Sequence, residues 1–156
     1  MNKWIFYGIA AAVLLGGGGY VVYKARGIRN NNPGNIRRTG TKWKGQSIEQ
    51  TDQAFVQFDT PEWGIRAMTR ILKNYQHAHG LNTVQDIIGR WAPDTENNTA
   101  AYIQHTAQSL GVAKDQPFDV MEKMPELIAV IIEHENGLQP YSSATIEEGI
   151  KREAVA

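Results

Sequence analysis

Apolar residues recur at helical spacing through most of the chain after residue 60, and turn-forming residues separate the periodic segments. The segment 61–79 carries apolar residues three and four positions apart, and Thr60 followed by proline favours a helix start. Thr83 and Asp86 form a capping box before the next periodic segment. Glycine follows the first and third segments, as is common after the last turn of a helix. The pattern predicts helices over 61–79, 84–91, 98–110 and 127–135, and a short acidic helix from Ser142.

The fourth of these segments is an apolar run that ends in a single carboxylate, Glu135. Ile128, Ile131 and Ile132 precede Glu135 by seven, four and three residues, so this carboxylate belongs to the buried stripe of the helix. Glu133 lies on the solvated side. Desolvation raises the pKa of a carboxyl group and suits it to hold a proton near neutral pH, which is what a general acid needs. The alternative is a structural glutamate at the rim of a core helix.

Between residues 30 and 58 the periodicity changes to short alternating pieces. The run NNNPGN at 30–35 is dense in turn formers, and the pieces 36–38, 43–48 and 54–58 follow it. These pieces predict a small, irregular antiparallel lobe. The expected fold class is therefore α+β, mostly α, with one small β lobe.

The first segment is the most apolar part of the chain. From Trp4 to Tyr23 there are 20 consecutive residues without a charge, which matches a bilayer core of roughly 30 Å, with aromatic residues at both ends. We expect one transmembrane helix, an N-terminal anchor over 1–25, a soluble domain over 26–156, and contact with a lipid bilayer through residues 4–23. A cleavable signal peptide is the alternative. We expect a single-pass protein in a virion membrane or in a bacterial inner membrane, with the domain acting in the periplasm. The basic residues that follow the span instead favour a cytoplasmic domain.

The overall charge is balanced but unevenly distributed. The chain has 16 basic and 16 acidic residues, of which 12 basic and 5 acidic fall in residues 1–93 and 4 basic and 11 acidic in residues 94–156. Seven basic and no acidic residues lie between Lys24 and Lys44, a patch that could hold nucleic acid or anionic lipid. No nucleic-acid-binding fold signature accompanies the patch, so nucleic acid is not an expected partner. A membrane-tethered nucleic-acid-binding module is one alternative function.

Several kinds of chemistry are excluded by residue type or spacing. The absence of cysteine excludes disulfides and thiol chemistry. His77 and His79 are two apart on a helix and point away from each other, and no HExxH pattern exists, so we expect no metal site. Neither a GxSxG elbow nor a phosphate-binding glycine loop is present, and we expect no cofactor.

Three stretches resemble known families. RGIRNNNPGNIRR with Trp43 and Gly45, FVQFDTPEWGIRA, and RWAPDTENNTAAYIQHTAQSLGV are similar to a phage family of virion structural proteins and to parts of the lysozyme-like peptidoglycan hydrolases. The residues Glu96, Thr99, Tyr102 and Ile103 resemble a cleft motif of lytic transglycosylases. The sequence from Glu135 to Gly137 resembles the Glu-Ser-Gly motif of their catalytic glutamate, with asparagine in place of serine. In those families the catalytic helix precedes the β lobe, so the resemblance implies a circularly permuted domain.

The resemblance implies a lysozyme-like domain that cleaves peptidoglycan glycan strands, as a lytic transglycosylase or a muramidase. Glu135 would act as general acid, and Asn35, Trp91 and Tyr102 would line the sugar subsites. A hydrolase would need a second carboxylate, for which Asp52 is the choice and Glu49 the other candidate nearby. The partners would be peptidoglycan and other virion membrane or capsid proteins. The remaining alternative is a non-enzymatic virion protein that binds cell wall or capsid.

Overall fold

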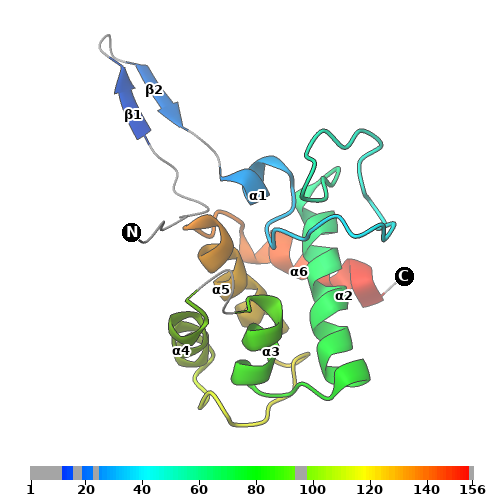
Figure 1. Cartoon of the computed structure of the whole chain (residues 1–156), viewed down its shortest axis with the longest axis vertical. Helices are drawn as coiled ribbons and strands as arrows, with labels where there is room; N and C mark the ends of the chain where they lie inside the picture. The colour runs from blue at the N-terminus through cyan, green and yellow to red at the C-terminus, as the bar shows by residue number, and fades with distance from the viewer. Residues whose placement is uncertain (1–11, 16–18, 23–24, 94–97, 155–156) are drawn as a thin grey trace.

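The computed structural model describes residues 12–15, 19–22, 25–93 and 98–154, and its helices surround one central helix (Figure 1). The helices are α1 (Arg26–Arg29), α2 (Pro61–His79), α3 (Val84–Trp91), α4 (Thr99–Leu110), α5 (Met124–Asn136) and α6 (Ser143–Ala154). Two short strands, β1 (Ala12–Leu15) and β2 (Gly19–Val22), precede them. The five long helices are those that the hydrophobic pattern predicts, while α1 was not predicted.

The local signals act largely as expected. Gly80 and Gly111 follow α2 and α4 in the left-handed conformation, with φ of 67° and 65°. The Thr83 hydroxyl accepts a hydrogen bond from the Asp86 backbone N–H at 3.2 Å, which closes the predicted cap of α3. Thr60 stands at the start of α2, but its side chain makes no capping bond. Proline at the first turn favours the start of that helix because its φ is already helical.

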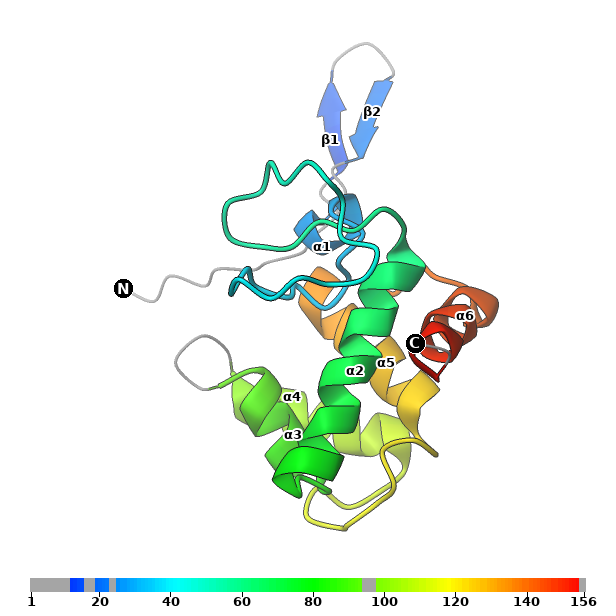
Figure 2. The same ribbon diagram turned by 90° about the vertical axis from the view of Figure 1, so that its right-hand side faces the viewer.

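α5 is the central helix and packs against α1, α2, α4 and α6. Its residues Ile128, Ile131 and Ile132 are fully buried, as the periodicity predicts, and Glu133 is exposed. α6 lies along α2, where Glu153 makes a buried ion pair with Arg66. Figure 2 shows α2 as the long spine of the molecule, with α3 and α4 toward one end and the loops of residues 36–58 toward the other.

The predicted β lobe is wrong, and with it the α+β fold class, because no strand exists within residues 25–93 and 98–154. Two isolated bridges, Arg37 with Phe55 and Gln46 with Phe58, hold the segment that was expected to form a sheet. Side chains take the places of ladder partners: the Asn32 amide bonds both the N–H and C=O of Ile36 and the C=O of Val56. The described part of the domain is therefore helical, with a loop region of residues 36–58 ordered by polar side chains.

The predicted transmembrane helix over 4–23 is also wrong. No helix among the described residues is long and apolar enough to cross a bilayer, and this finding overturns the predicted single-pass membrane localisation. The described parts of that segment are β1 and β2, which pair antiparallel with Ala12 opposite Val22. The other residues of the predicted span, 4–11, 16–18 and 23, lie outside the described residues. Apolar composition alone does not separate a helix from a strand, and valine and tyrosine favour the extended form.

Candidate functional site

The asparagine-rich loop at 30–35 is ordered by its own side chains. Asn31 and Asn35 adopt the left-handed conformation, with φ of 50° and 47°, which asparagine tolerates better than most residues. The Asn31 amide donates to the C=O of Phe58 at 3.0 Å. Asn32 is fully buried. Together these contacts fix the direction in which the Asn35 side chain leaves the loop, toward the C-terminal end of α5.

Glu135 lies half-buried in the last turn of α5, and two side chains from other parts of the fold donate to its carboxylate. The Asn35 amide donates to Oε2 at 3.1 Å and to the Glu135 backbone C=O at 3.1 Å. The Trp91 indole N–H, at the end of α3, donates to Oε1 at 3.1 Å. Each carboxylate oxygen thus accepts a hydrogen bond from a side chain of another segment, which orients the acid group before any ligand binds.

Close backbone approach at two glycines brings the loop against α5 and α3. A Cβ atom on Gly27 of α1 would collide with the amide oxygens of Asn35 and Asn136. A Cβ atom on Gly34 would lie within 3.0 Å of side-chain atoms of Met68 and Trp91. The buried Asn136 closes the contact from the other side, because its amide donates to the Pro33 C=O at 2.7 Å. Small residues are therefore required where the loop meets the helices that carry Glu135 and Trp91.

Tyr102 of α4 lies beside this carboxylate and is only 3% exposed. Burial, and after it the charge of Glu135, raise the pKa of the Tyr102 phenol well above its ordinary value. Its hydroxyl has no hydrogen-bond partner among the described residues. The ring stacks on His134 with 3.8 Å between the centroids and 14° between the planes. The structure thus brings Asn35, Trp91 and Tyr102 together around Glu135.

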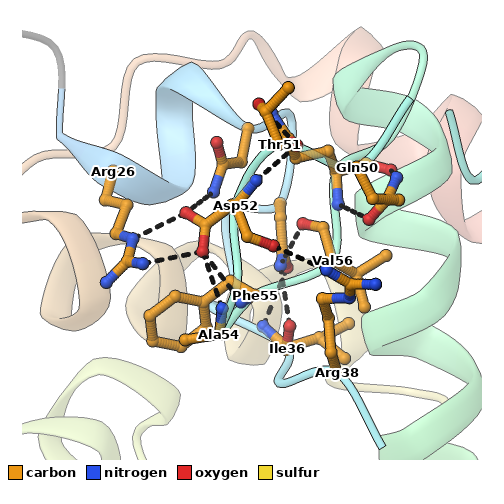
Figure 3. Close-up of polar contacts among 12 residues, drawn as sticks. Arg26, Ile36, Arg38, Gln50, Thr51, Asp52, Ala54, Phe55 and Val56 are labelled. Carbon is orange, nitrogen blue, oxygen red and sulfur yellow. Dashed lines mark hydrogen bonds and ion pairs between the residues drawn. The ribbon is translucent and has the colours of Figure 1, made fainter. Parts of the chain in front are cut away.

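The environment of Asp52 is very different, as Figure 3 shows. Arg26 binds both carboxylate oxygens at 2.7 Å, the Asn30 amide donates at 2.8 Å, and the backbone N–H groups of Ala54 and Phe55 donate at 3.0 Å. The hydrogen-bonded Arg26 guanidinium is the main reason that the pKa of this carboxyl lies far below its usual range. Every one of these contacts ties Asp52 into the loop region, and both of its carboxylate oxygens already accept hydrogen bonds.

The remaining sequence candidates lie elsewhere. Glu96 of the transglycosylase-like motif lies outside the described residues. Across residues 25–93 and 98–154 no group of three histidine or carboxylate side chains could hold a metal ion. A shallow hollow lined by Gln76, Phe118 and Met121 among others lies at the C-terminal end of α2, whereas the asparagine-rich loop lies against its N-terminal half, where Gly64 meets Asn31.

One residue of the site was not identified from the sequence as part of it. His134 directly precedes Glu135, and its ring contacts the rings of Tyr102 and His105, with 4.9 Å between the two imidazole centroids. Burial and the neighbouring His105 lower the pKa of His134, while Glu133 opposes the shift. The available signal was the i, i+3 spacing of Tyr102 and His105, which places both rings on one face of α4.

Comparison with known proteins relates the chain to a phage protein. No protein-family model matches the chain. The chain is 41% identical over 130 residues to Protein P5 of Pseudoalteromonas phage PM2, and the alignment covers 81% of each chain. The expected relationship to phage proteins is confirmed at this level. The chain belongs to the family of this phage protein.

Proposed function

We propose that this member of the Protein P5 family cleaves the glycan strands of bacterial peptidoglycan, with Glu135 as the general acid. The observation that supports the proposal is that side chains from separate parts of the fold converge on the Glu135 carboxylate. Asn35, Trp91 and Tyr102 come from a loop and two helices, and they meet at one carboxylate at the end of the central helix. The same residues were selected before from the resemblance to peptidoglycan hydrolases.

The order of the segments supports the proposal in a further way. The resemblance requires the asparagine-rich loop and the catalytic helix to be neighbours in space, whatever their order in the chain. The Asn35 amide reaches the Glu135 carboxylate across 100 residues of sequence. A permuted order of the two parts, with the loop first and the acid last, is compatible with that contact.

In the proposed reaction the Glu135 carboxylic acid donates its proton to the glycosidic oxygen as the bond from that oxygen to the anomeric carbon breaks. The leaving sugar departs as an alcohol, and positive charge develops on the ring that remains. Glu135, now ionised, lies where it stabilises that charge. Asn35 and Trp91 hold the carboxylate through its two oxygens, which keeps its direction fixed while its charge changes.

The environment of Asp52 favours the transglycosylase form of the reaction. A hydrolase needs a second carboxylate to activate water or to act as nucleophile. The carboxylate chosen for that role is bound at both oxygens by Arg26, which leaves it poorly placed to act. Attack by a hydroxyl of the substrate itself requires only Glu135, which takes back the hydroxyl proton and is regenerated as the acid.

Binding of cell wall without cleavage is the second candidate function, and one observation favours it. Asn35 and Trp91 hold the Glu135 carboxylate as an oriented hydrogen-bond acceptor, and binding of a sugar hydroxyl needs such an acceptor as much as cleavage does. A virion protein that only binds glycan would need the same aromatic and amide side chains but no proton transfer. The two functions differ in a single measurable product, the soluble fragments released from peptidoglycan.

The test is therefore a comparison of two glutamates on one helix. Purified peptidoglycan is incubated with the wild-type chain, with Glu135→Gln and with Glu133→Gln, which changes an exposed residue two positions away. The proposal expects soluble fragments from the wild type and from Glu133→Gln, and none from Glu135→Gln. Binding of all three proteins to peptidoglycan without released fragments would favour the second candidate instead.

A further inference from the structure

The last turn of α5 is fixed to α4 by a ring contact one residue before the proposed acid. His134 lies face to face on Tyr102, with centroids 3.8 Å apart and planes 14° apart, and its other neighbour on α4 is the tilted ring of His105. His134 is the residue through which α5 meets two aromatic side chains of α4. The stacked pair therefore ties the last turn of α5, which carries Glu135, to α4.

The unpartnered hydroxyl of Tyr102 indicates that a ligand binds beside it. It is buried, it has no hydrogen-bond partner among the described residues, and the charge of Glu135 reaches it. A buried hydroxyl without a partner is costly unless something else satisfies it. A sugar oxygen bound beside Glu135 would do so, because the phenol can donate to it. The stack with His134 covers one face of the Tyr102 ring and so limits the directions that its hydroxyl can take.

We propose that His134 is a positioning residue for the proposed glycan cleavage. Its stacked imidazole holds the Tyr102 ring and the final turn of α5 in register, so that the phenol hydroxyl and the Glu135 carboxylate face the same sugar. The inference rests on the proposed function and extends it to a residue that touches neither the substrate nor the reacting bond. This role requires a flat ring at position 134 but does not require the imidazole nitrogens.

The experiment measures kcat and KM on peptidoglycan for three variants of the full chain, well below the melting temperature of the least stable one. His134→Phe keeps a flat ring and retains kcat within about 3-fold of the wild type. His134→Leu fills similar space without a flat ring and lowers kcat about 10- to 100-fold with a much smaller change in KM, because misplacement by about 1 Å has costs of that size. His105→Ala removes the tilted ring, leaves the stack in place, and retains kcat within about 3-fold.

The possible failures are separable. A purely structural role would lower the melting temperature of His134→Leu and leave its kcat unchanged, and that result overturns the inference alone. Loss of kcat in His134→Phe as large as in His134→Leu also overturns it, because the nitrogens would then be needed. A wild-type chain that releases no fragments refutes the proposed function itself and the inference with it. NMR of the Tyr102 ring protons, assigned with Tyr102→Phe, verifies that only His134→Leu loses the stack.

Discussion

The buried ion pair between α2 and α6 gives a prediction whose size follows from the structure. Glu153 and Arg66 lie 2.9 Å apart with side-chain exposures of 3% and 6%. The second oxygen of Glu153 binds Arg70 at 3.1 Å, but that arginine is half exposed. Replacing Glu153 by glutamine keeps the shape of the side chain and leaves the Arg66 guanidinium buried without its countercharge.

Breaking a buried ion pair from one side costs about 3–5 kcal/mol of unfolding free energy. For a chain of this size each kcal/mol lowers the melting temperature by about 2–4 °C, so Glu153→Gln should melt about 6–20 °C below the wild type. Glu148→Gln is the matched control, because it makes the same change of charge on the same helix. Glu148 pairs with Arg152 at 2.9 Å, but its side chain is 47% exposed, and such a pair contributes about 0.3–0.5 kcal/mol.

The assay is thermal unfolding followed by circular dichroism at pH 7 for the three proteins side by side. The reasoning requires a drop of about 2 °C or less for Glu148→Gln and the much larger drop for Glu153→Gln. Equal melting temperatures for the two variants would refute it, since they would mean that burial of the α2–α6 pair has no energetic consequence. The double change Arg66→Met with Glu153→Leu should recover much of the lost stability, because it removes both buried charges together.

Three further predictions concern Asp52, Asn35 and a pair of glycines. Asp52→Asn should lower the free energy of unfolding by about 2–3 kcal/mol at pH 7. The pKa of Asp52 is depressed in the folded chain, so its contribution to stability is present above the unfolded pKa of about 4 and is lost as the pH falls below that value. In chemical denaturation, the difference in stability between the variant and the wild type should therefore shrink below about pH 4. Asn35→Gly keeps the positive φ and removes the amide, so activity on peptidoglycan should fall about 10-fold while the melting temperature changes little, and an unchanged rate would contradict the role of the amide. Gly27→Ala should destabilise the fold by about 1–3 kcal/mol because its Cβ atom would collide with two amide oxygens. Gly89→Ala, whose Cβ atom would meet open space on α3, should stabilise the fold by up to about 1 kcal/mol. Shifts of the denaturation midpoint in the same direction for both variants, relative to the wild type, would contradict this packing.

The helical part of the fold was predictable because each long helix carries its own local signals. The stripe of Ile128, Ile131 and Ile132 and the cap at Thr83 depend on neighbours within one or two turns. α1 has only four residues, which is too short for a period to be seen. The hydrophobic pattern therefore gives the number and the limits of the long helices closely, and it does not give the short helix between them and the first strands.

The predictions of the β lobe and the membrane span were wrong for a common physical reason, since both were inferred from local sequence patterns without knowledge of hydrogen-bond partners. The segment 54–58 alternates like a strand, but the side chains of Asn32 and Gln50 take hydrogen bonds of Val56 and Gln57 that a neighbouring strand would supply. The apolar residues before Lys24 fit a helix by length, yet the described part of them forms a hairpin. The partners that decide such cases lie far away in sequence.

The candidate site shows the same division. Helical spacing predicts that Glu135 lies at the end of a buried stripe. The resemblance, and not the periodicity, predicts that Asn35, Trp91 and Tyr102 lie around it. Asp52 was chosen by its position in the loop alone, because its pairing with Arg26 across 26 residues leaves no trace in a local pattern. The cleavage of peptidoglycan, the domain boundaries and the sugar subsites stay predictions.

The central claim is that Glu135 transfers a proton during cleavage of a glycan strand, and one measurement tests it most directly. The wild-type chain, Glu135→Gln and Glu133→Gln are each incubated with purified peptidoglycan, and the soluble products are analysed by mass spectrometry. We predict glycan fragments from the wild type and Glu133→Gln, lighter by one water than the hydrolysis products because a substrate hydroxyl attacks, and no fragments from Glu135→Gln. The same yield of fragments from Glu135→Gln as from the wild type would contradict the claim.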